Sequence, residues 1–138
     1  MRYSLSLGVC LFGVAFQANA QELDKFQGVW QVEKLSSGGV DAPAAEVAKM
    51  VITFKDDQAI PKDNPTDIAK IKVDPVKKPA EIDFTDKGGK INKGIYRFID
   101  KDTLELSMNL SEEALRPKEF VSPKGTNHVV LLMKRMKN

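Results

Sequence analysis

Apolar and polar residues alternate along several short segments of this chain. The alternation is clearest in residues 103–110, where leucine and methionine occupy every second position, and it recurs in residues 67–73 and 81–85. A period of two places successive side chains on opposite faces of a strand, so each segment has one face suited to burial. The pattern predicts a protein that is mainly β.

Turn-forming residues separate these segments. All seven prolines lie between apolar runs rather than inside them, as expected for the turns of a β protein. Asp100-Lys101-Asp102 is a tight polar turn, and residues 94–110 therefore predict a hairpin. Further strands are expected at residues 28–35, 50–55, 58–60 and 128–133, and short helical pieces at 23–27, at 43–49 with Asp41 as N-cap, and at 111–115. Antiparallel strands at this spacing, about eight in number, favour a closed barrel or a sandwich.

The N-terminus has the three parts of a secretory signal: a positive charge at Arg2, an apolar run, and small residues at Ala18 and Ala20. We expect cleavage between Ala20 and Gln21 and export to the periplasm or the extracellular space. The apolar run is too short for a membrane anchor, which needs about 20 apolar residues. A lipoprotein site at Cys10 fits poorly, because bulky Val9 precedes it. The mature chain, residues 21–138, is then one domain without cysteine and without a membrane span.

Charge and side-chain chemistry narrow the functions to consider. The 21 basic and 19 acidic residues are interleaved, whereas nucleic-acid binding needs clustered positive charge. His128 is the single histidine, so the usual zinc ligand sets cannot be assembled. The serines have no positioned base, and aspartates in tight turns usually bond to the backbone. We therefore expect no enzyme activity, no metal and no cofactor.

An ordered set of motifs resembles a group of uncharacterised, exported bacterial lipocalin-like domains. The resemblance spans nearly the whole mature chain and departs from the group's pattern between Gln58 and Asp67. It implies a lipocalin-like, antiparallel up-and-down barrel with one or two short helices, but no established activity. The motifs are Phe26-Gln27-Gly28-Val29-Trp30, Ile82-Asp83-Phe84-Thr85, Gly94-Ile95-Tyr96, Asp100-Lys101-Asp102-Thr103-Leu104, Arg116-Pro117-Lys118-Glu119-Phe120 and residues 129–135.

The resemblance also implies how one end of the barrel is closed. In lipocalins, the tryptophan of the Gly-x-Trp motif lies at that end beneath a basic side chain. Here the motif is Gly28-Val29-Trp30, and position along the chain favours Arg135 or Lys134 as the partner, with Arg116 as a competitor. Such a cation–π contact stabilises a fold by roughly 0.5–2 kcal/mol. Trp30 is therefore expected to be structural.

Two functions remain open, and neither needs catalysis. The first is binding of a small apolar molecule inside the barrel, with Tyr96 or Arg97 as a polar handle. The alternative is a structural or protein-interaction module of the cell envelope, acting on an exported partner through its surface, with the same side chains filling the barrel as core. An eight-stranded barrel is just wide enough for either. The candidate ligand-binding residues are Phe54, Phe84, Tyr96, Phe98, Leu106, Met108 and Leu131.

Overall fold

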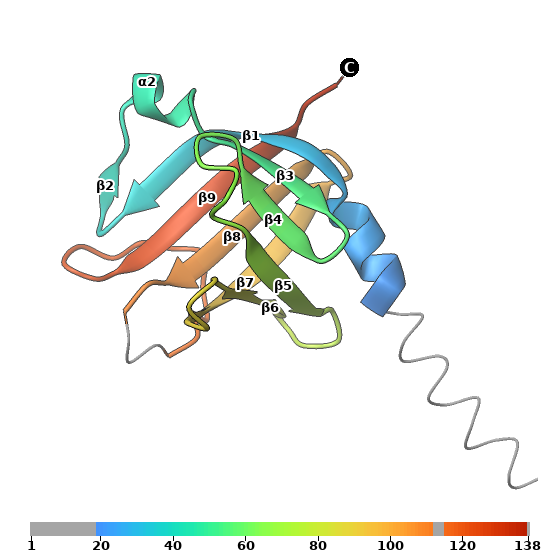
Figure 1. Ribbon diagram of the computed structural model, residues 1–138. Helices are drawn as coiled ribbons and strands as arrows, with labels where there is room; N and C mark the ends of the chain where they lie inside the picture. The colour runs from blue at the N-terminus through green and yellow to red at the C-terminus, as the bar shows by residue number, and fades with distance from the viewer. Residues whose placement is uncertain (1–18, 112–114, 138) are drawn as a thin grey trace, which may run out of the picture.

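The computed structural model describes residues 19–111 and 115–137. The predicted signal therefore lies outside the described residues except for its last two positions, and most of the helical turn predicted at 111–115 lies outside them as well. Residues 19–26 are helical, and this range includes the expected cleavage site at Ala20–Gln21. In Figure 1 this helix stands at one end of the strands.

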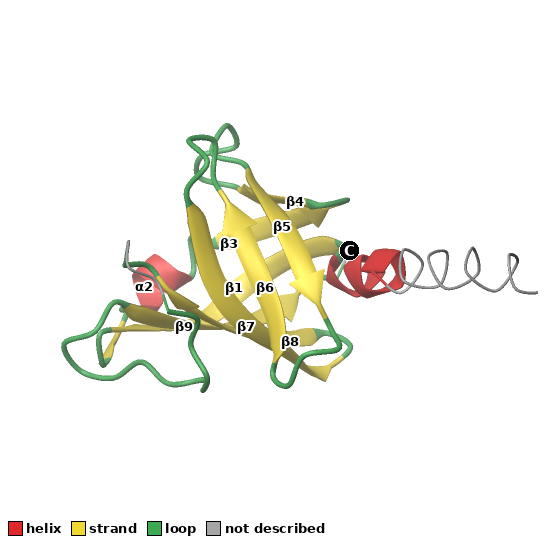
Figure 2. Ribbon diagram, turned by 90° about the horizontal axis from the view of Figure 1, so that it is seen from below, coloured by secondary structure: helices red, strands yellow, loops and turns green. Residues whose placement is uncertain are grey.

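The fold is a closed, antiparallel, up-and-down β-barrel, as the sequence predicted. Neighbours in the sheet follow chain order from β3 to β9, and β1 pairs with both β3 and β9, which closes the ring (Figures 1 and 2). β2 pairs with the last two residues of β1 and takes no part in closing the ring, so eight of the nine strands in the described residues form the barrel wall. The strands are β1 (Gly28–Ser37), β2 (Val40–Asp41), β3 (Val51–Lys55), β4 (Gln58–Pro61), β5 (Ala69–Asp74), β6 (Ala80–Thr85), β7 (Ile91–Asp100), β8 (Thr103–Asn109) and β9 (His128–Arg135).

The predicted hairpin at residues 94–110 is confirmed by the pairing of β7 with β8. At its turn, the backbone N–H of Asp102 donates to the Asp100 carboxylate at 2.8 Å. This bond, with a further one from the Thr103 side chain, holds the pKa of Asp100 below its ordinary value. The carboxylate therefore serves the turn, as expected of aspartate in a tight connection.

Among neighbouring strands of the barrel wall, β4 and β5 share the fewest residue pairs. β4 makes four residue pairs with β3 but only two with β5, Gln58 with Lys70 and Ala59 with Ala69. Pro61 ends β4 and has no N–H to donate, and the chain then loops away through residues 62–68 before β5 begins. The segment where the sequence departed from the lipocalin-like pattern is thus one short strand followed by a loop.

The helix predicted at residues 43–49 is α2 (Ala44–Val47), but its start differs from the prediction. Pro43 occupies the N-cap position and no side chain caps the helix. Asp41, predicted as the cap, lies instead in β2, where it accepts a hydrogen bond from the Ser36 hydroxyl. The prediction was wrong because an aspartate shortly before a helix can either cap the helix or belong to a preceding strand. The sequence alone does not distinguish these two positions.

The two faces of β7 have different environments. Gly94 and Tyr96 face the interior, while Ile95 points outward and is nevertheless only 1% exposed. Residues 115–123, here called the strap, cover that outer face, and the Ser107 hydroxyl donates to the strap carbonyl of Glu119 at 3.1 Å. The strap thus forms a short additional layer on the outside of the barrel wall.

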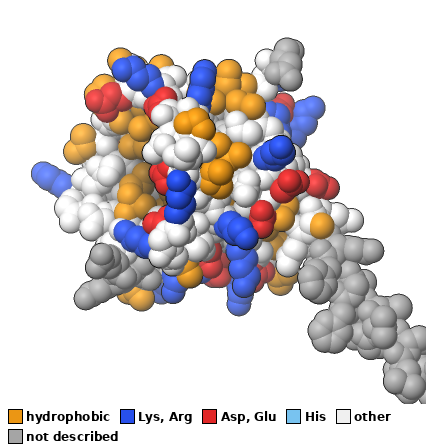
Figure 3. All heavy atoms as spheres, viewed as in Figure 1, with side chains coloured by type: hydrophobic (Ala, Val, Ile, Leu, Met, Phe, Trp, Pro, Cys, Tyr) orange, Lys and Arg blue, Asp and Glu red, His pale blue; other side chains and the backbone are white. Residues whose placement is uncertain are grey.

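Positive and negative side chains are interspersed on the surface of the barrel. Figure 3, drawn from the side seen in Figure 1, shows lysines and arginines scattered among aspartates and glutamates, with apolar side chains between them. Neither sign forms a continuous patch on this face. The mixture agrees with the interleaving of charges along the chain.

Candidate functional site

One end of the barrel is filled by aromatic side chains. Phe26, at the end of the N-terminal helix, is fully buried and packs edge-on against Tyr96 and Phe98, each with ring centroids 5.0 Å away. Phe54 lies 5.5 Å from Phe26 and Trp30 lies 6.3 Å from Phe98. The helix residue Phe26 thus joins side chains from three strands, β1, β3 and β7, into one plug.

Arg135 covers this aromatic plug. Its guanidinium lies 4.4 Å from the centre of the Trp30 ring, and it donates to the backbone carbonyls of Lys25 and Lys101 at 2.8 and 3.1 Å. It also donates to the carbonyl of Gln27 and, at 3.1 Å, to the Asp102 carboxylate. The planar fork of arginine can satisfy several acceptors at once, which a lysine ammonium cannot do with the same geometry. The guanidinium therefore ties the helix, the β7–β8 turn and Trp30 together.

Gly28 leaves room for the Arg135 side chain, and Trp30 is held in place by a hydrogen bond. Gly28 has φ +120°, and a Cβ there would stand 3.0 Å from a nitrogen of Arg135, so a side chain would meet both strain and crowding. The Trp30 indole N–H donates to the Phe26 carbonyl at 2.7 Å. Arg116, the competing partner for Trp30, lies elsewhere: it bonds to the carbonyls of Ile82 and Gly94 on the barrel exterior.

The opposite end of the barrel holds a cavity of about 300 Å³. The strand ends at Pro61, Thr85, Ile91 and Asn109 mark this end, which we call the mouth. Phe54 separates the cavity from the aromatic plug, because it packs against Phe26 and also lines the cavity. The other apolar lining residues are Ile52, Ala59, Pro61, Ala69, Phe84, Leu106, Met108 and Leu131.

Five of the seven predicted ligand-binding residues line this cavity, and two do not. Tyr96 and Phe98 face inward but belong to the plug, nearer the closed end. The predicted polar handles are also absent from it. The Tyr96 hydroxyl is bonded to Glu22 at 2.6 Å, and Arg97 points outward, paired with Glu105 at 2.5 Å and stacked over Phe120 at 4.2 Å. The five that line the cavity are Phe54, Phe84, Leu106, Met108 and Leu131.

Three polar residues that sequence reasoning missed line the cavity at the mouth: Asp67, Asp86 and Asn92. Asp67 precedes β5 and Asp86 follows β6, so both had the sequence context of turn residues. Asn92 gave a usable signal, because it shares the parity of Gly94 and Tyr96 along β7 and must face the same way. The Oδ1 atom of Asn92 is buried and has no hydrogen-bond partner.

A second opening adjoins the first. It has a volume of about 240 Å³ and shares Ile52, Pro61 and Leu131 with the mouth cavity, while Met50 and Leu35 widen the apolar wall. Lys49 and Asp63 stand at its edge and balance in charge. The shared side chains make the two openings one apolar region at the same end of the barrel.

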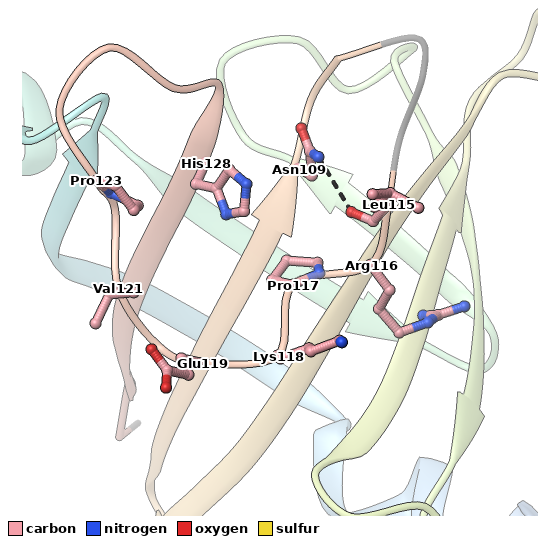
Figure 4. A pocket seen from close by; sticks show the side chains of 9 residues that line it. All are labelled: Asn109, Leu115, Arg116, Pro117, Lys118, Glu119, Val121, Pro123 and His128. Atoms are coloured by element: carbon pink, nitrogen blue, oxygen red, sulfur yellow. Dashed lines mark hydrogen bonds between the residues drawn. The ribbon is translucent and has the colours of Figure 1, made fainter.

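A larger hollow, of about 500 Å³, lies outside the barrel under the strap. Figure 4 shows the strap bending round it, with Pro117 and His128 across the hollow from Val121 and with the Asn109 side chain bonded to the Leu115 carbonyl at 3.1 Å. Leu115 and Val121 are 81% and 48% exposed, so its wall is open to solvent. The mouth cavity, lined by side chains from seven of the eight barrel strands, is the better candidate for holding a small molecule.

The described residues contain no group of three or more histidine, cysteine, aspartate or glutamate side chains arranged to hold a metal ion. Within that same part of the chain, no helix has the length and apolar character needed to cross a bilayer. Comparisons with protein-family models, with curated proteins and with solved structures gave no significant match. The fold and the mouth cavity therefore define the class: an antiparallel barrel that is plugged at one end and hollow at the other.

Proposed function

We propose that this protein is an exported, non-enzymatic binding protein of the lipocalin-like class, which holds a small apolar molecule at the mouth of its barrel. The observation that supports this most is the division of the barrel interior. Aromatic side chains fill one end completely, whereas inward-facing side chains at the other end leave about 300 Å³ between them. Small-molecule sites have this character: a mostly apolar, preformed concavity with a few polar groups.

The route into the cavity also supports binding. β4 and β5 share only two residue pairs, and the loop 62–68 follows at the mouth. Few backbone hydrogen bonds need to break for these strands to part, and segments with few such bonds open at low cost in free energy. A ligand would enter between Pro61 and Asp67, which face each other across this gap as lining residues.

The proposal is tested by titrating the protein, purified after expression of the full sequence, with the neutral dye N-phenyl-1-naphthylamine. We expect saturable enhancement of dye fluorescence with one site per chain. Ala69→Phe would place a ring in the cavity and abolish binding. Ala45→Phe adds the same ring at an exposed position of α2 and should leave binding unchanged. A folded wild-type protein that shows no saturable binding would overturn the proposal.

The alternative, an interaction module of the cell envelope, draws support from the hollow under the strap. Its exposed apolar residues Leu115 and Val121 are of the kind found at protein contacts. In that case the dye would bind weakly and without saturation, and Ala69→Phe would have no effect on it. The same titration therefore separates the two functions.

A further inference from the structure

The polar lining of the mouth cavity carries negative charge and contains no cation. Asp67 and Asp86 contribute two carboxylates and Asn92 an amide, while no lysine or arginine is among the lining residues. We propose that the cavity selects amphiphiles with an apolar tail and a positively charged amine head, and that it disfavours fatty carboxylates. This inference rests on the proposed function and specifies the class of ligand.

The two carboxylates are available to a ligand. Neither takes part in an ion pair among residues 19–111 and 115–137. Asp86, which lines the cavity, accepts a backbone hydrogen bond from Lys90 N–H at 2.9 Å through Oδ1, and this bond orients the carboxylate. Asp67 and Asp86 lie at the neighbouring ends of β5 and β6, so a bound ammonium would meet two negative charges at this edge of the mouth, and a bound carboxylate would meet repulsion.

Asn92 provides a second and independent reason. Its Oδ1 atom is buried without a partner, although buried polar atoms are nearly always hydrogen-bonded. A donor that enters the cavity can complete this bond, because Asn92 lines the cavity. An ammonium has three N–H donors and no acceptor, whereas an ionised carboxylate has acceptors alone. The orphaned oxygen therefore favours the same head group as the two aspartates do.

The volume sets the length of the tail. A cavity of about 300 Å³ corresponds to roughly ten water molecules at about 30 Å³ each. A methylene group occupies a similar volume, so a chain of about ten carbons fills the apolar part with its head at the rim. The charges at the adjoining opening, Lys49 and Asp63, cancel and leave this preference intact.

The test compares three probes with the same tail: decylamine, decanol and decanoate, each used at pH 7 to displace N-phenyl-1-naphthylamine. We expect decylamine to bind about fivefold more tightly than decanol, in line with ion pairs at a partly exposed site, and decanoate more weakly than decanol. The amine preference should shrink as salt is added, because salt screens exposed charges.

Matched variants assign the effect to the mouth. The double variant Asp67→Asn/Asp86→Asn should bring decylamine down to the affinity of decanol while decanol itself binds as before. The double variant Asp24→Asn/Asp57→Asn removes the same charge from exposed sites at the plugged end and should keep the amine preference. Its retention excludes an effect of net charge alone.

The possible failures are distinguishable. If decanol binds and is blocked by Ala69→Phe, but decylamine shows no advantage or the mouth variants change nothing, this inference is overturned and the proposed function stands. If neither the dye nor any of the three probes binds to the folded protein, the proposed function fails, and the inference with it.

Discussion

The Tyr96 hydroxyl donates a hydrogen bond of 2.6 Å to Glu22, which ties the N-terminal helix to the inner wall of the barrel. Glu22 is 8% exposed and also pairs with Lys25 at 2.8 Å. The predicted cleavage after Ala20 would retain both partners. The ring of Phe26 packs against the same tyrosine ring, with centroids 5.0 Å apart. The helix therefore contacts Tyr96 both through the polar hydroxyl and through the apolar ring.

This contact predicts a fall in stability at alkaline pH. Burial, together with the hydrogen bond to Glu22 and its negative charge, raises the pKa of Tyr96 well above the ordinary value. Above about pH 10 the unfolded chain loses the tyrosine proton while the folded protein retains it, so the unfolded state is increasingly favoured. The free energy of unfolding should then decrease by about 1.4 kcal/mol per pH unit through this group.

Urea unfolding followed by the fluorescence of Trp30, the single tryptophan, measures this slope. Tyr96→Phe cannot ionise and should show a shallower decline between about pH 10 and pH 11 by the same amount. At pH 7 the variant gives the cost of losing the hydrogen bond alone. Parallel curves for the two proteins would contradict the assignment of the alkaline slope to Tyr96.

Arg135→Lys should destabilise the protein by about 1–3 kcal/mol, although the charge is kept. Lysine cannot reach the carbonyls of Lys25 and Lys101 while lying over Trp30, and the part-buried Gln27 carbonyl would also lose its donor. The measurement is the urea midpoint at constant slope.

Arg97→Lys is the matched control for this substitution. It makes the same change in an arginine that also stacks on an aromatic ring and pairs with a carboxylate, but on the outer surface with 57% of its side chain exposed. Exposed pairs contribute about 0–1 kcal/mol. Equal losses for the two variants would show that the multiple acceptors at Arg135 add nothing.

The alternation of side chains was sufficient to predict a mainly β fold, either a barrel or a sandwich, because it reports directly which face of a strand is buried, and the resemblance to lipocalin-like domains favoured the barrel. It does not report height along the barrel axis. Phe54, Phe84 and Tyr96 all face inward, yet Tyr96 lies in the plug and Phe84 at the mouth, a difference set by strand register. Register depends on pairings between segments far apart in the chain, which a local pattern cannot contain.

The strap and the polar mouth were beyond sequence reasoning for other reasons. Ile95 points outward and is buried because the strap lies over it. Predictions from alternation assume that one face of the sheet is exposed to solvent, and so they miss such a covered position. Asp67 and Asp86 have the sequence context of turn residues, and Asp86 does bond within its turn, through Lys90 N–H. A turn residue can also line a cavity when the turn stands at the barrel mouth.

Gly94→Ala should destabilise the protein by about 1–3 kcal/mol. A Cβ at this position would come within 2.6 Å of the Ser107 carbonyl oxygen, a backbone atom held in the β7–β8 ladder, and within 2.9 Å of Met108. The backbone must move for the methyl group to fit, and Met108 lines the cavity, so dye binding should weaken too.

Gly88→Ala is the control for a glycine-to-alanine change. Gly88 lies in the β6–β7 turn without a positive φ, and the nearest atom to a new Cβ would be 3.5 Å away. Its stability should stay within about 0.5 kcal/mol of wild type. A neutral Gly94→Ala would show that β7 and β8 can separate at this point without cost.

Arg116→Gln should release the strap from the barrel. Arg116 donates to the carbonyls of Ile82 and Gly94 at 3.2 and 2.9 Å and lies 2.7 Å from the Asp83 carboxylate, so one side chain joins the strap to β6 and β7. Its loss leaves a half-buried carboxylate without its cation, and we expect a cost of about 1–3 kcal/mol.

Hydrogen exchange shows which part of the protein loses stability in Arg116→Gln. Amides in residues 115–123 should exchange faster in Arg116→Gln, while those of β1 and β9 remain protected, because the barrel closes without the strap. Lys118→Gln removes the same charge from an exposed strap position, which makes no side-chain bond to the wall within residues 19–111 and 115–137, and should exchange like wild type. Uniformly faster exchange in Arg116→Gln would instead mean that the strap and the barrel unfold as one unit.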